Sequence, residues 1–97
     1  MQRVNMVFDD TLDDVDIIVI PDETASEIEA IGQAFLQWLP TATDDAYRTV
    51  IDGHVCPVAE TDGFVKWLNA RHCLGAEKAY IEVQHTHYCP QYKTVEF

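Results

Sequence analysis

The chain has 97 residues, of which 17 are Asp or Glu and 6 are Lys or Arg, so its formal net charge is −11. This length holds one domain, and a hydrophobic content of 47% with only 4 Gly and 4 Pro excludes a disordered acidic tail. The longest unbroken apolar run, residues 17–20, is too short to cross a bilayer, and the shortage of bases disfavours a protein that grips nucleic-acid phosphates.

Two strands are predicted near the start of the chain. Residues 3–8 alternate in polarity, with Val4, Met6 and Phe8 on one side, which indicates a half-buried strand. An acidic connector, residues 9–14, leads to a second strand over residues 15–20. The apolar run in this second strand indicates a central position in a sheet, with both faces buried.

A helix is predicted over residues 25–39, ending before Pro40. Asp22 or Thr24 is expected to cap it, because Thr24-x-x-Glu27 has the spacing of a capping box. Apolar side chains recur at steps of three and four, which predicts an amphipathic helix lying on a sheet. The expected buried face consists of Ile28, Ile31, Phe35, Trp38 and Leu39.

A β-hairpin is predicted over residues 47–58, because Asp52 and Gly53 can adopt the positive φ angles that a two-residue turn requires. The turn also fixes the register of the two strands. The expected pairs are Ile51 with His54, Val50 with Val55, and Thr49 with Cys56.

The last third of the chain predicts a helix and two strands. The helix covers residues 62–72, with Thr61 as its cap and Gly75 as its terminating residue, and its expected buried residues are Phe64, Trp67 and Leu68. Residues 79–83 alternate as a strand, with an extension as far as Pro90 left open. A final short strand over residues 92–97 is expected to pair back on this strand.

The predicted order is therefore ββαββαββ. Layer rules favour an α+β fold in which two amphipathic helices pack on one face of a mainly antiparallel sheet. The whole chain, residues 1–97, is expected to form a single compact domain.

The excess of acidic residues lies in the first two thirds of the chain. Residues 1–62 contain 14 acids and 2 bases, whereas residues 63–97 contain 3 acids and 4 bases. Such clustering lowers stability by repulsion, so we interpret it as a carboxylate-rich surface for a basic partner, with a merely solvated face as the plainer alternative. The candidate partner-binding residues are Asp9, Asp10, Asp13, Asp14, Asp16, Asp22, Glu23, Glu27 and Glu29.

The leading functional hypothesis is a small acidic binding or inhibitor protein whose partner is a basic protein, such as a nuclease or another nucleic-acid-binding effector. Its charge, size and mixed composition are comparable with those of DNA-mimicking phage proteins, small anti-CRISPR inhibitors and the immunity proteins of nuclease toxins. This analogy involves no shared motif. The hypothesis implies no direct binding of nucleic acid, no membrane association, and a monomer or a homodimer.

A zinc site is the first alternative. In a strand, His85, His87 and Cys89 would share one side, and His54 and Cys56 would do the same on the hairpin. Histidine and cysteine are the ligands that zinc prefers, although these spacings match no familiar zinc pattern. A calcium loop over residues 9–16 is weaker still, because it lacks the glycine and closing glutamate of such loops. The second alternative is a small enzyme of unknown reaction, for which the sequence identifies no catalytic residue.

The cysteines and the start of the chain bear on its compartment. An odd set of three cysteines without a Cys-x-x-Cys pair is typical of a reduced protein, and residues 1–10 lack the apolar core of a secretory signal. A cytoplasmic location is therefore expected, with a bridge from Cys56 or Cys73 to Cys89 left open. Tyr88 and Tyr92 are expected either to anchor an interface or to cover the edge of the sheet.

Overall fold

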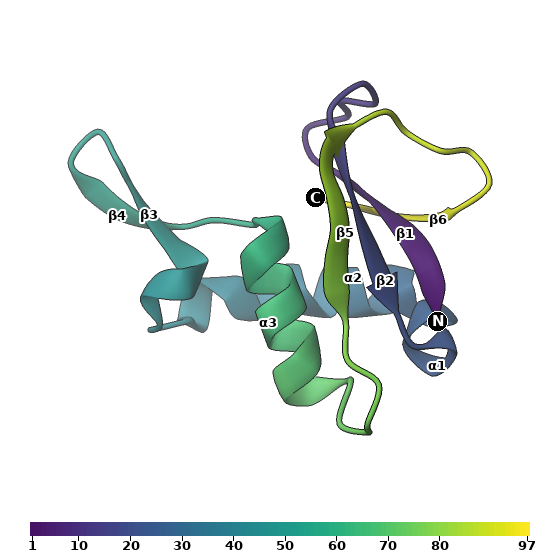
Figure 1. The fold of residues 1–97 in the computed structure, drawn as a ribbon. Coiled ribbons are helices and arrows are strands. Elements are labelled where there is room, and N and C mark those ends of the chain that lie inside the picture. The colour runs from purple at the N-terminus through teal and green to yellow at the C-terminus, as the bar shows by residue number, and fades with distance from the viewer.

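A four-stranded sheet with the strand order β5-β2-β1-β6 forms the centre of the computed structural model, which describes residues 1–97 (Figure 1). The strands are β1 (Gln2–Val7), β2 (Val15–Ile20), β5 (Tyr80–Thr86) and β6 (Lys93–Glu96). Strand β2 pairs antiparallel with β1 and β5, whereas β6 pairs parallel with β1. The predicted α+β class is confirmed.

The helices are α1 (Asp22–Ala25), α2 (Ile28–Trp38) and α3 (Thr61–Arg71), and two short 3-10 turns, η1 (Leu39–Thr41) and η2 (Asp45–Tyr47), follow α2. One core of 17 buried residues joins α2 and α3 to the main sheet. The expected buried residues of both helices lie in this core, except Trp38, which is only partly buried. The order along the chain is thus ββααββαββ, with one more helix than the sequence predicted.

The first predicted helix is divided at Glu27, whose φ of −119° leaves the helical range. The expected capping box is wrong, because neither α1 nor α2 has a side-chain cap. The Thr24 side chain is buried instead, with its hydroxyl 3.7 Å from the Cys73 sulfur. The capping predicted for α3 is also wrong. Thr61 lies inside that helix, which ends at Arg71, so Gly75 does not terminate it.

Strand β2 is central and buried along its whole length, as predicted. Strand β1 was expected to be half-buried, but all four residues from Val4 to Val7 are buried, because a second layer covers the other face of the sheet. In that layer Tyr88 and Tyr92 pack against a small cluster of buried valine and isoleucine side chains. The two tyrosines therefore cover the sheet, which was the plainer of their two expected roles.

The segment that carries these tyrosines, residues 87–92, crosses from one edge of the sheet to the other. Asn5 fastens it, since its amide nitrogen donates to the Cys89 carbonyl at 2.8 Å and its amide oxygen accepts from the Cys89 N–H at 3.1 Å. As a result β6 pairs with β1 and not with β5. The prediction that the last strand pairs back on its predecessor is wrong.

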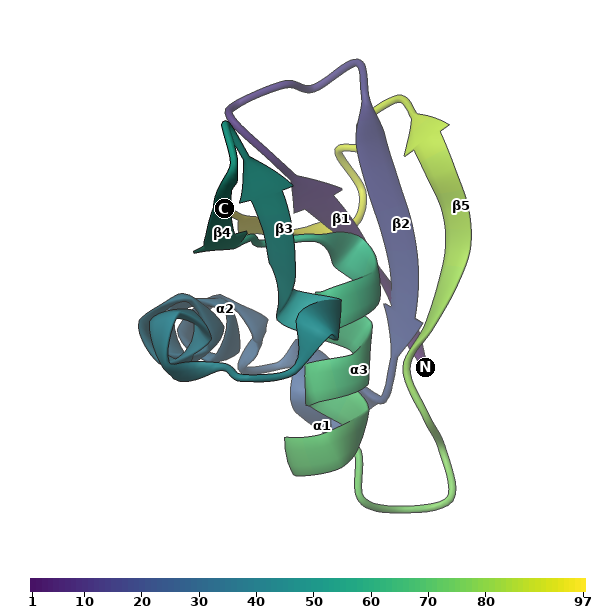
Figure 2. The ribbon, with the colours of Figure 1, turned by 90° about the vertical axis from the view of Figure 1, so that its left-hand side faces the viewer.

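The predicted hairpin is confirmed in its turn and register. Strands β3 (Arg48–Ile51) and β4 (His54–Pro57) pair as expected, with φ angles of 51° at Asp52 and 79° at Gly53. They form a separate two-stranded sheet and do not join the main one. The hairpin projects from the body of the molecule in Figure 1, and Figure 2 views the molecule from the side on which the hairpin lies.

Candidate functional site

The nine predicted partner-binding acids lie at opposite ends of β2. Five of them are in or next to the β1–β2 connection, and the other four follow the end of β2, in α1, the turn after it and the start of α2. Six strand residues span roughly 17 Å, so the nine carboxylates do not form one patch. The first group is Asp9, Asp10, Asp13, Asp14 and Asp16, and the second is Asp22, Glu23, Glu27 and Glu29.

Three of these nine carboxylates have a partner within the protein. Asp14 lies 2.8 Å from the His85 ring, and Asp22 lies 2.9 Å from the Met1 ammonium group, which holds the pKa of Asp22 below its usual value. Asp16 is buried and accepts hydrogen bonds from neighbouring elements. The other six carboxylates are exposed and form no ion pair.

Asp16 is buried because a β-bulge and a helix terminus meet around it. Between the pairs Val15–Thr86 and Ile17–Val83, two residues of β5 lie opposite the single residue Asp16 of β2. One of the two, His85, has a φ of 56°, and its N–H donates to the Asp16 carboxylate at 3.1 Å.

Helix α3 supplies the other contact of this carboxylate. The Thr61 hydroxyl, at the first residue of α3, donates to Asp16. Negative charge is favourable next to a helix N-terminus, where backbone N–H groups have no partner within the helix. Asp16 therefore fastens the bulge of β5 to the start of α3.

An acidic hollow of about 410 Å³ opens beside this contact, between the end of β1 and the start of α3. Four carboxylates line it, those of Asp9, Asp16, Glu60 and Asp62, and no lysine or arginine does. Its remaining lining residues are Phe8, Ala59, Thr61, Gln84 and His85. A smaller hollow of about 230 Å³ adjoins it and adds Asp14 and Thr11.

His85 is the basic residue of this region. Its hydrogen bond with Asp14, together with the negative charges of Asp14 and Asp16, raises the pKa of its imidazole above the usual value. The imidazole is exposed, so it can exchange protons with solvent while its ring stays beside Asp14. The charge at the rim of the acidic hollow therefore depends on pH.

This raised pKa predicts a pH-dependent contribution to stability. A group with a raised native pKa stabilises the fold fully below its unfolded pKa of about 6.5, and the contribution disappears as the pH rises through the native value. Replacing Asp14 by Asn is expected to lower the His85 pKa towards 6.5 and to reduce this pH dependence, with only the charge of Asp16 still raising the pKa. An NMR titration of the imidazole, with thermal melts at acid and alkaline pH, measures both effects. Asp13→Asn, which removes a neighbouring charge outside the contact, should leave the His85 titration nearly unchanged.

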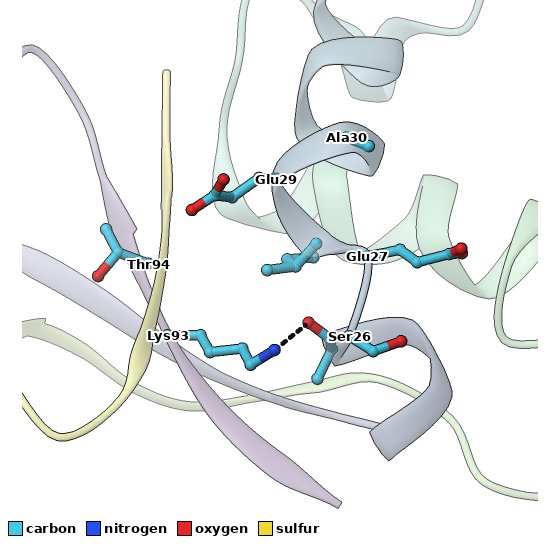
Figure 3. Close-up of a pocket in the computed structure, with 8 residues that line it drawn as sticks. Ser26, Glu27, Glu29, Ala30, Lys93 and Thr94 are labelled. Carbon is cyan, nitrogen blue, oxygen red and sulfur yellow. Dashed lines mark hydrogen bonds between the residues drawn. The ribbon is translucent and has the colours of Figure 1, made fainter.

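Two of the four acids in the second group border a larger groove between the α1–α2 turn and β6 (Figure 3). This groove holds about 570 Å³ and is lined by Glu27 and Glu29, but also by Lys93, whose ammonium donates to the Ala25 carbonyl at 3.2 Å. Figure 3 shows Lys93 reaching across to the α1–α2 turn, with Glu29 above it. A cation therefore already offsets part of the negative charge here, in contrast to the acidic hollow.

The histidines and cysteines predicted as zinc ligands are not brought together. His54 and Cys56 lie on the projecting hairpin. Strand β5 ends at Thr86, so His87 and Cys89 lie outside the strand and do not share one of its sides with His85, as the prediction required. No group of three or more His, Cys, Asp or Glu side chains has an arrangement that could hold a metal ion. The geometry thus gives the zinc and calcium alternatives no support. All three cysteines are free.

No pattern in the sequence indicates Glu60 and Asp62 as site residues, or the contacts of Asp16 with α3 and β5. The two acids lie about 50 residues from Asp9 in the sequence, and they come close to Asp9 only because α3 packs against the main sheet. One signal was present, since Asp16 interrupts a strand that is otherwise apolar. A buried carboxylate normally has charged or hydrogen-bonding partners. The position of Asp16 in a buried strand therefore indicates hydrogen-bond donors on neighbouring elements.

Comparison of the chain with protein-family models, with curated proteins and with solved structures found no match. No helix in the structure has the length and apolar character needed to cross a membrane.

Proposed function

We propose that this chain is a small acidic binding protein that inhibits a basic, nucleic-acid-handling protein by occupying its cationic surface. The acidic hollow carries this proposal. It presents three exposed carboxylates, those of Asp9, Glu60 and Asp62, beside the buried Asp16, and it contains no lysine or arginine that would neutralise them. An arginine or lysine head group of the partner would enter the hollow and exchange its hydration for charge-assisted hydrogen bonds.

The exposed acids next to the hollow serve the approach of the partner. Asp9 and Asp10 both have positive φ angles, 53° and 58°, in the turn that follows β1, and Asp13 lies further along the same connection. Their carboxylates present negative charge in a short stretch of chain, as successive phosphates do in a nucleic acid. With a net charge of −11 behind them, they would steer a cationic partner and accelerate its association.

The test compares two variants with the same net charge. One replaces Asp9, Asp10 and Asp13 by Asn, which tolerates positive φ as Asp does. The other replaces Glu23, Glu27 and Glu29 by Gln at the opposite end of β2. We expect the first variant to associate with the captured partner about tenfold more slowly and the second to be nearly unaffected, because steering depends on charge close to the contact.

The readout is capture of proteins from a cell lysate, identification by mass spectrometry, and binding kinetics with the purified partner. Captured proteins should bind nucleic acid, and duplex DNA should displace them. Capture should weaken as salt rises, because the screening length falls from about 8 Å near 0.15 M salt to about 3 Å at 1 M. Equal losses in the two variants would show that only net charge matters and would contradict the assignment of the hollow.

A further inference from the structure

The β3–β4 hairpin has no covering layer. Seven of its eight strand residues are exposed, and three of these are large apolar side chains, with exposed fractions of 66% for Val50, 51% for Ile51 and 63% for Val55. It contacts the body mainly at its base, where the Arg48 guanidinium donates to the Ala42 carbonyl. A two-stranded hairpin alone is marginally stable, and an unpaired strand edge is a template for another strand.

The turn decides which backbone groups face outward. In a two-residue hairpin the flanking pair, Ile51 and His54, exchanges hydrogen bonds, and the next pair, Val50 and Val55, directs its N–H and C=O groups away from the hairpin. Two residues further along β4 the outward position is Pro57, which has no N–H. The Arg48 N–H at the same level of β3 is also in use, so each edge has one residue with a free outward N–H, Val50 or Val55. Charge distinguishes the two edges, because Arg48 and Asp52 flank Val50, whereas the uncharged Gly53 and Pro57 flank Val55.

From this geometry we infer that the chain forms a homodimer by antiparallel pairing of β3 with β3 of a second copy. In this dimer a two-fold axis passes between the Val50 residues of the two copies. Each Val50 N–H then donates to the Val50 carbonyl of the other copy. The same register places Arg48 of each copy opposite Asp52 of the other and Thr49 opposite Ile51. The contact is thus complementary to itself in charge, as an isologous interface must be.

Charge also favours a second copy on this edge. The hairpin strands and turn carry one base and one acid, Arg48 and Asp52, in a chain whose net charge is −11. Two copies can therefore meet here without juxtaposing their acidic ends. Strand pairing cannot extend beyond Arg48, because the Arg48 N–H already donates to the Asp45 carbonyl. Pairing of such short strands buries less than a standard stable interface, so the dimer forms in a concentration-dependent manner.

Cross-linking tests the register. Antiparallel residues that exchange hydrogen bonds have Cα atoms about 5.5 Å apart, within the range for a disulfide. Val50→Cys, in a Cys56→Ser, Cys89→Ser background, should form a covalent dimer on mild oxidation. Ile51→Cys is also exposed, but its two copies would lie about 8 Å apart across the axis, which is too far. Equal yields from both variants, or none from Val50→Cys, would overturn this register.

A pair of proline variants tests the edge without a new thiol. Both Val50→Pro and Val55→Pro remove an outward N–H and an exposed valine, and neither removes a hydrogen bond within the hairpin. By sedimentation equilibrium, Val50→Pro should be monomeric at concentrations where wild type and Val55→Pro dimerise. A monomeric wild type at every concentration up to the millimolar range would overturn the proposal, as would equal losses in the two variants.

Salt dependence separates the dimer from the proposed inhibitory function. Screening reduces the repulsion between two acidic chains, so the dimer should strengthen severalfold between low and moderate salt, whereas capture of a basic partner should weaken. Val50→Pro should still bind that partner. Each proposal can therefore fail while the other stands.

Discussion

Replacing Phe35 by alanine is expected to lower the free energy of unfolding by about 3–5 kcal/mol, the largest loss from any single truncation proposed for this protein. The Phe35 side chain is fully buried, and its ring centroid lies 5.1 Å from that of Phe64, 5.2 Å from Trp67 and 5.7 Å from Phe97. These rings join α2, α3 and the end of the chain. Removal of the Phe35 ring would leave a cavity that its packed neighbours cannot fill, and it would abolish favourable edge-to-face contacts.

Urea denaturation and thermal melts measure this loss. The expected loss is a large part of the total stability of such a domain, which is about 5–15 kcal/mol. In a domain of this size a loss of that magnitude should lower the melting temperature by roughly 15 °C or more. Phe8→Ala is the matched control, because Phe8 is only partly buried and stacks on a single ring, that of Phe97, at 5.5 Å. Equal losses from the two substitutions would mean that Phe35 does not hold the core together.

Replacing Asp16 by alanine is expected to cost about 2–4 kcal/mol, because hydrogen bonds to a charged group are strong and their buried donors would lose an acceptor. The Thr61 hydroxyl and the His85 N–H both donate to this carboxylate, and the Gln84 amide lies at 3.5 Å. Thr61→Val removes a single donor and should cost less, about 1–2 kcal/mol. Denaturation of both single variants and the double variant gives the coupling between the two residues.

The same substitution also tests the acidic hollow. If Asp16 fixes the bulge of β5 against α3, its loss should weaken partner binding even under conditions in which the variant remains folded. Asp62→Asn removes one charge from the hollow without breaking this contact and should weaken binding less. Unchanged stability of Asp16→Ala would contradict the role assigned to this carboxylate.

Features that depend on neighbouring residues could be predicted from the sequence. The apolar run in β2 required burial on both faces, and every residue of that strand is buried. The Asp52-Gly53 turn required one register, and the observed hairpin has it. Helical periodicity placed Phe35, Phe64 and Trp67 in the core. In each case the spacing of side chains along a helix or strand carries the information.

Local patterns were misleading where a distant residue competed for the same group. Thr24 has the spacing of a capping residue, but its hydroxyl faces Cys73, 49 residues away. Thr61 precedes a helical pattern, but its hydroxyl donates to Asp16, 45 residues away. The sequence cannot rank a cap against such a contact, because burial of the side chain depends on how the helices dock.

The α+β class, the central strand, the hairpin register and the negative charge could all be predicted, because each follows from composition or from residues close along the chain. Three features became known only from the folded chain: β6 pairs with β1, the nine acids lie at opposite ends of β2, and Glu60 and Asp62 join Asp9 in one hollow. These outcomes depend on contacts between residues far apart in the chain. Their free energies come from the packing and hydrogen bonding of whole elements, which no local pattern encodes.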